Sequence, residues 1–157
     1  MKLFQIEEPD GPPSDADVPG LAIGIDLSAA EAAVAASLGG NAEILRDRDG
    51  NARVAVGALR RPDGAWDGDA LREALLALRA RAEKALARPA THAVVAIAGP
   101  VDEAAVRAIM PAGGAAGLVI VMLVDAGEAA KAAGAAGSDA AARGAAILAE
   151  DAAAPRG

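Results

Sequence analysis

The sequence has no cysteine and no tyrosine, and it holds a single histidine, a single tryptophan and a single phenylalanine. Without cysteine the chain forms no disulfide bond, has no thiol nucleophile and offers no thiolate to a metal ion or an iron–sulfur cluster. A single histidine argues against a multi-histidine zinc site. Because aromatic side chains are so few, the core has to rest on leucine, isoleucine and valine, with close alanine and glycine packing between them.

Acidic residues outnumber basic ones. The 157 residues carry 22 acidic and 15 basic side chains, and the formal net charge is −7. Binding to nucleic acid requires clustered lysine and arginine, whereas here bases alternate with acids, as in Arg79, Arg81, Glu83 and Lys84. No uninterrupted apolar run reaches about 18 residues, so we expect no membrane span, and the N-terminus has no signal-peptide pattern. We therefore expect a cytoplasmic protein with neither nucleic acid nor membrane as partner.

The first half of the chain predicts an arm followed by short strands. Residues 1–20 contain four prolines and several acids, which is typical of a flexible N-terminal arm. The ordered domain is predicted over residues 21–151, with a frayed tail over residues 152–157. Glycine-containing turns at residues 39–41 and 49–51 indicate an antiparallel meander at its start. The strands predicted in this meander cover residues 21–27, 32–38, 42–46 and 53–59.

The second half predicts alternating helices and strands. Leucines at spacings of three and four predict a helix over residues 69–87, and two later apolar runs predict buried strands. The remaining predicted elements are strands over 93–98 and 118–124 and helices over 102–113, 127–133 and 138–149. Strands that follow crossover helices lie parallel to the first strand. The fold class predicted is therefore α/β, with a mixed five-stranded sheet in the order of a ribonuclease-H-like lobe.

Several blocks of sequence resemble a known family. Residues 22–28, A-I-G-I-D-L-S, resemble the opening phosphate loop I-G-I-D-L-G-T-T of DnaK-type heat-shock chaperones, which are actin-like ATPases. Residues 112–118, A-G-G-A-A-G-L, are similar to the family's A-G-x-x-A-G-L element, and residues 144–148, G-A-A-I-L, to its G-A-A-I-Q helix. Residues 1–9 are similar to the start of HscA, the relative dedicated to iron–sulfur cluster assembly. The resemblance implies lobe I of the nucleotide-binding domain, in a truncated and degenerate form.

The resemblance also assigns roles to three residues. Asp26 matches the aspartate that binds Mg²⁺ and phosphate, and Asp125 matches the glutamate of the family's E-P-T motif. Ser28 stands where the family has glycine, and Ala29 and Ala30 replace two threonines. Because a phosphate cradle needs backbone freedom and hydroxyl donors, the resemblance implies at most a weak, degenerate ATP and Mg²⁺ site at Asp26, Ser28 and Asp125, and no catalytic residue. In the alternative interpretation, Asp26 merely ends a strand and caps a turn.

The function implied is binding without catalysis. The chain shows neither the family's second phosphate loop nor a peptide-binding domain, so we expect a single-lobe remnant that acts as a binding or dimerisation module. Components of iron–sulfur assembly or of the chaperone machinery are candidate partners. We expect a homodimer through the last helix or the cleft face, because the second lobe covers these surfaces in the family and apolar patches left uncovered often mark interfaces.

Two enzymatic alternatives remain open. One is an ATPase whose cleft is completed in trans by a second lobe. The other is a ribonuclease-H-type nuclease, which needs several carboxylates around two metal ions. Asp26, Asp102 and Asp125 are its candidate ligands, because all three lie near the predicted carboxyl ends of strands.

Three further features have a structural and a functional interpretation. Trp66, in the loop over residues 60–68, either folds onto the domain or anchors a partner. His92 precedes a strand, and a surface or edge position is expected rather than catalysis. The glycines within residues 113–117 resemble a phosphate loop only in composition, so they are expected to end a helix and allow close packing.

Overall fold

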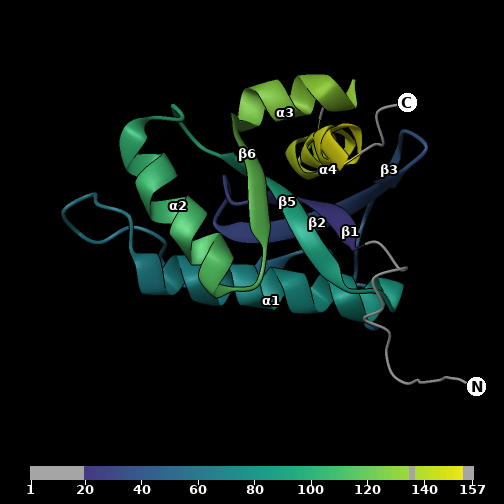
Figure 1. The fold of residues 1–157 in the computed structure, drawn as a ribbon, viewed down its shortest axis with the longest axis horizontal. Coiled ribbons are helices and arrows are strands. Elements are labelled where there is room, and N and C mark those ends of the chain that lie inside the picture. The colour runs from purple at the N-terminus through teal and green to yellow at the C-terminus, as the bar shows by residue number, and fades with distance from the viewer. Residues whose placement is uncertain (1–19, 135–136, 154–157) are drawn as a thin grey trace, which may run out of the picture.

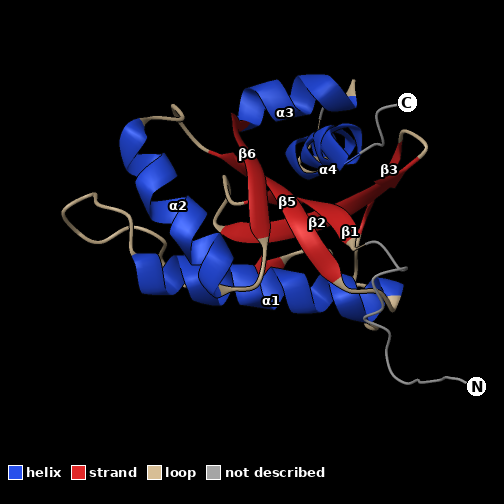
Figure 2. Ribbon diagram, viewed as in Figure 1, coloured by secondary structure: helices blue, strands red, loops and turns tan. Residues whose placement is uncertain are grey.

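The computed structural model describes residues 20–134 and 137–153, in which a six-stranded mixed sheet lies between two pairs of helices (Figures 1 and 2). The strands are β1 (Leu21–Asp26), β2 (Glu31–Leu38), β3 (Asn41–Ile44), β4 (Val54–Ala55), β5 (Ala90–Ile97) and β6 (Val119–Asp125). The helices are α1 (Gly68–Leu86), α2 (Glu103–Ala115), α3 (Ala126–Ala133) and α4 (Ala140–Ala153). Within these residues, no helix is both long and apolar enough to cross a membrane.

The sheet has the order β3-β2-β1-β5-β6. Strands β1, β5 and β6 are parallel, whereas β2 runs antiparallel to both β1 and β3. The predicted α/β class is confirmed, but the predicted number of five strands is wrong, because β4 adds a sixth beside the start of β2. The strand predicted over residues 53–59 shrinks to Val54–Ala55, since the side chains of Val56 and Leu59 turn towards the core instead of continuing a ladder.

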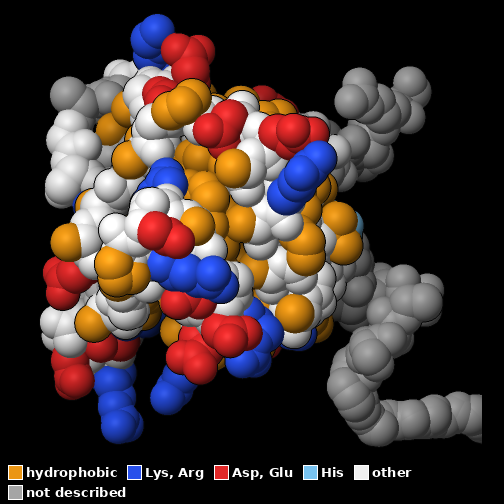
Figure 3. Space-filling model, turned by 90° about the vertical axis from the view of Figure 1, so that its left-hand side faces the viewer, with side chains coloured by type: hydrophobic (Ala, Val, Ile, Leu, Met, Phe, Trp, Pro, Cys, Tyr) orange, Lys and Arg blue, Asp and Glu red, His pale blue; other side chains and the backbone are white. Residues whose placement is uncertain are grey.

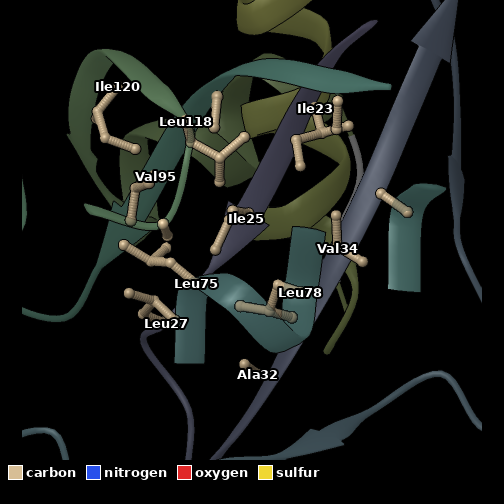
Figure 4. Close-up of a cluster of buried hydrophobic side chains, with 14 of the residues drawn as sticks. Ile23, Ile25, Leu27, Ala32, Val34, Leu75, Leu78, Val95, Leu118 and Ile120 are labelled. Atoms are coloured by element: carbon tan, nitrogen blue, oxygen red, sulfur yellow. The ribbon is translucent and has the colours of Figure 1, made fainter. Parts of the chain in front are cut away.

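The large apolar side chains gather between the sheet and the pair α1 and α2. Helix α1 begins after Asp67, whose carboxylate accepts a hydrogen bond from the backbone N–H of Ala70 (3.1 Å). Its leucine stripe, which includes Leu75 and Leu78, is fully buried against Ile25 of β1 and its neighbours (Figure 4). The leucine spacing that predicted α1 therefore also marks its buried face.

The opposite face of the sheet is packed with alanine and glycine. A side chain at Gly24 of β1 would place its Cβ 2.0 Å from the backbone nitrogen of Ala146, and a side chain at Gly144 would meet the carbonyl oxygen of Ala129 at 1.5 Å. The backbone of α4 therefore lies directly on β1, and α3 lies directly on α4. Most of the alanines of α4 are buried. The sheet and α3 thus cover most of these alanines, whereas Ile147 and Leu148 are half-buried. The homodimer expected through the last helix stays a prediction.

The C-terminal half of α4 is tied to the turn between β2 and β3. The carboxylate of Glu150 accepts hydrogen bonds from the Ser37 hydroxyl (2.8 Å) and from the backbone N–H groups of Gly39 (2.6 Å) and Gly40 (2.9 Å). Both glycines have positive φ angles, 63° and 83°, which turn their N–H groups to the same side. These hydrogen bonds, led by the one from Gly40, lower the pKa of Glu150 from its ordinary value of 4.5.

The contact between α4 and β1 predicts a large penalty for one added methyl group. We expect Gly24→Ala to lower the free energy of unfolding by about 2 kcal/mol or more, because the new Cβ overlaps backbone atoms that cannot rotate away. The control is Gly114→Ala in α2, where a Cβ meets open space and should stabilise by up to about 1 kcal/mol. Urea denaturation followed by the fluorescence of the single tryptophan measures both. Equal effects in the two variants would contradict the close packing.

The Glu150 carboxylate predicts an acid-dependent loss of stability. Because its pKa is lower in the folded state, its contribution is complete above the ordinary value of 4.5 and is lost as the pH falls through the folded value. Glu150→Gln imitates the protonated form, so we expect it to unfold at lower urea concentration than the natural chain near pH 6. The gap between the two should narrow as the pH falls below 4.5. Glu73→Gln, at an exposed position of α1, is the control. A gap that stays constant with pH would refute the role of the charge.

Candidate functional site

Asp26 lies at the carboxyl end of β1 and is only 2% exposed. One carboxylate oxygen, Oδ1, accepts hydrogen bonds from the backbone N–H of Ser28 (2.8 Å) and from its hydroxyl (2.5 Å). The other oxygen, Oδ2, lies 3.7 Å from Nη1 of Arg53. Asp26 thus caps the turn after β1, and it is at the same time one half of a buried ion pair.

Arg53 joins three parts of the chain at this point. Its guanidinium donates to the carbonyl oxygen of Glu31 at the start of β2 (3.3 Å) and to the carbonyl oxygen of Ser138, and it lies 3.4 Å from Oδ1 of Asp139. Because burial of an isolated carboxylate is costly, this guanidinium is what makes the buried position of Asp26 tolerable. The sequence marks Arg53 only as a basic residue beside an apolar run, and that pattern does not identify it as a partner of Asp26.

These residues do not fit a Mg²⁺ or nucleotide phosphate site at Asp26. The Ser28 hydroxyl donates back to Asp26, and the Arg53 guanidinium stands beside the oxygen that a metal ion would need. A cation at Oδ2 would have to displace Arg53 and overcome its charge.

Asp125 does not join Asp26. In the sheet, Asp26 lies opposite Ala96 of β5, and Asp125 lies opposite Ile97. Ala96 belongs to the core under α4, whereas Ile97 belongs to the core under α1 and α2. Consecutive residues of a strand point to opposite faces of the sheet. The side chains of Asp26 and Asp125 therefore leave the sheet on opposite faces. The Asp125 carboxylate instead caps α3 by accepting from the backbone N–H of Gly127 (2.8 Å).

The third candidate metal ligand is also used as a helix cap. Asp102 precedes α2, and its Oδ1 accepts a hydrogen bond from the backbone N–H of Ala105 (2.9 Å). Within the part of the chain that the structure describes, no group of three histidine or acidic side chains is placed to hold a metal ion. The structure thus does not gather Asp26, Asp102 and Asp125 into one metal-binding group, and each carboxylate accepts a hydrogen bond from a nearby backbone N–H.

A cleft of about 350 Å³ lies beyond the carboxyl ends of β1 and β5. Its walls include Ser28, Leu59 and Trp66, and the guanidinium of Arg60 lies 3.8 Å from the centre of the Trp66 ring. Trp66 is half-buried and packs against the main core, so it folds onto the domain. Ligands of open α/β sheets often bind at such an edge, but nearly all of the lining here is apolar, with only Ser28 and Arg60 adding polar side chains.

The remaining predicted positions lie away from this cleft. His92 is half-buried near the start of β5, where its Nδ1 lies 2.7 Å from the Thr91 hydroxyl. Gly113 packs against Ile120, since a Cβ there would lie 2.3 Å from that side chain, and Gly117 turns the chain with a φ angle of 82°. The expectation that these glycines end a helix and allow close packing is confirmed.

No protein-family model matches the chain, and no curated protein matches it either. Function therefore has to be inferred from the residues and their geometry.

The ion pair of Asp26 and Arg53 predicts strong coupling between two distant positions. We expect Arg53→Met to lower the free energy of unfolding by about 2 to 3 kcal/mol, because it leaves a buried carboxylate without a cation. Adding Asp26→Asn should recover part of this loss. We therefore expect the double variant to lose less free energy of unfolding than the two single variants lose in sum. Urea denaturation measures the cycle.

The control for this cycle is Arg107→Met, which breaks an exposed pair with Glu103 (3.0 Å). Such surface pairs contribute at most about 0.5 kcal/mol within a helix. If Arg53→Met costs no more than this control, Arg53 does not compensate the buried carboxylate.

Proposed function

We propose that this chain is a non-catalytic ribonuclease-H-like lobe, related to DnaK- and HscA-type chaperones, that acts as a binding and self-association module. The observation that carries the proposal is the Arg53 guanidinium beside the buried carboxylate of Asp26. This guanidinium stands beside the carboxylate that the resemblance assigns to Mg²⁺ binding, which supports a lobe without that metal ion.

The order of strands and helices along the chain supports the proposed ribonuclease-H-like lobe. A meander of β1, β2 and β3 is followed by α1, β5, α2 and β6, and both later strands run parallel to β1. This is the order that the resemblance implies for lobe I of the chaperone ATPase domain.

The residues around Asp26 support a lobe that does not transfer phosphoryl groups. Phosphoryl transfer depends on clamping the phosphate charges from several sides. Here the loop at residues 28–30 reads S-A-A, and the one hydroxyl in it is bonded to Asp26. Asp125, the other acidic residue that the resemblance assigns to the clamp, caps α3. The residues of the clamp are thus occupied in holding the fold.

The distribution of exposed apolar side chains supports a binding role. Among the large hydrophobic residues that stay exposed, most lie on or beside α2 and β6, on one side of the molecule. Such gathered apolar patches mark protein interfaces. Proteins of iron–sulfur assembly or of the chaperone machinery are the candidate partners that the resemblance suggests, besides a second copy of the chain.

Calorimetric titration with Mg-ATP tests the non-catalytic half of this proposal. We expect no saturable heat, either with the natural chain or with Asp26→Asn, because Arg53 already satisfies the Asp26 carboxylate. Saturable binding that disappears in Asp26→Asn would overturn the proposal and would favour the ATPase completed in trans. Mn²⁺ alone, titrated into the same two proteins, separates metal binding from nucleotide binding.

A further inference from the structure

We propose that two copies of this chain pair along the free edge of β6, antiparallel and about a two-fold axis, so that their sheets join into one. This inference rests on the proposed self-association, and it identifies the free edge of β6 as the surface through which two copies associate. A strand paired antiparallel with its own copy satisfies the unpaired N–H and C=O groups of both edges at once.

The edge of β6 is unusually open. Among the described strands, β6 pairs only with β5 and ends the sheet. Residues 119–124 read V-I-V-M-L-V, without a charge or a proline, although natural sheets usually protect a free edge with such residues. Two features protect this edge, an irregularity in the ladder at Val121 and the charge of Asp125 at the end of the strand. The other end of the sheet, β3, is only four residues long and includes Glu43.

Apolar side chains surround this edge. Val119 is 57% exposed, and Val121 and Met122 are about 40% exposed, on the strand itself. Helix α2, which packs beside β6, adds Val106 and Met110, which are four residues apart and therefore on one stripe of the helix. Figure 3 looks onto the left-hand side of Figure 1, where α2 lies, and it shows hydrophobic side chains in the middle with charged groups of both signs around them. An apolar centre with a polar rim is the usual anatomy of a protein interface.

The charges beside the edge favour a second copy as the occupant. Helix α2 carries the exposed pair Glu103 and Arg107, and α3 carries the exposed pair Glu128 and Lys131. Each pair is neutral, whereas the whole chain has a net charge of −7. Two copies can thus meet at this side with little of the repulsion that their total charge imposes elsewhere.

The area around the β6 edge is close to the area that each partner contributes to a stable interface. Strand β6 has seven residues, which span about 23 Å at a rise of about 3.3 Å per residue. A sheet covered by helices on both faces is about 30 Å thick. This side therefore offers roughly 700 Å², close to the roughly 800 Å² that each partner contributes to a standard interface.

Sedimentation over a wide range of concentration tests the interface. We expect the natural chain to sediment with twice the mass of 15.4 kDa. We expect Val121→Lys to raise the dissociation constant at least roughly tenfold, because the two-fold axis brings the like charges of the two copies close together. The control, Leu76→Lys, changes an exposed leucine of α1 that lies outside this side and should leave the dimer unchanged. Circular dichroism confirms that each variant is folded.

Cysteine cross-linking tests the symmetry independently of any loss of stability. Because the chain has no cysteine, a single introduced cysteine can form a disulfide only with its own copy. Opposed residues of antiparallel strands lie about 4.5 to 5.5 Å apart between Cα atoms, which a disulfide can span. We expect Val119→Cys, Val121→Cys, Met122→Cys and Leu123→Cys to cross-link with a maximum at the residue nearest the axis, and Leu76→Cys to form no disulfide between copies.

The outcomes separate this inference from the function on which it rests. A dimer that survives Val121→Lys and does not cross-link through β6 would overturn the β6 interface while leaving self-association intact. A strict monomer at every concentration would overturn both. Cross-linking at Leu76 as strong as at β6 would likewise refute the interface.

Discussion

The close contact of α4 with the middle of the sheet is the constraint on which the rest of this structure depends. Gly24 and Gly144 carry no side chain at the two points where backbones touch, and alanines fill the remaining space. Because α4 lies so near the strands, side chains at both of its ends reach the meander. Arg53 meets Ser138 and Asp139 just before α4, and Glu150 holds the β2–β3 turn near its other end.

This arrangement changes the meaning of the buried carboxylate at the end of β1. A buried aspartate at the carboxyl edge of parallel strands is a natural metal ligand when its oxygens face a cavity. Asp26 faces a guanidinium, so its charge contributes to the connection between the meander and α4. A buried pair of this kind is weak evidence for stability by itself, but removing one partner is costly. The fold therefore constrains this position.

Much of the fold could be predicted from local patterns. The leucine spacing identified α1, the apolar runs identified β5 and β6, and the crossover rule made them parallel to β1. The errors arose where a local pattern depends on distant packing. Residues 53–59 alternate like a strand, yet Val56 and Leu59 turn inward. Most alanines of α4 are buried, because an alanine-rich face allows two backbones to approach closely.

The sequence by itself determined the elements, their order and the local caps, because these depend on residues a few positions apart. The role of Asp67 as a helix cap can be read in this way, and so can the turn after Asp26. Only the tertiary structure decided that Arg53 would meet Asp26 and Asp139, the latter 86 residues away along the chain. It also decided that the edge of β6 stays open, since exposure depends on which strand ends the sheet and on where the helices lie.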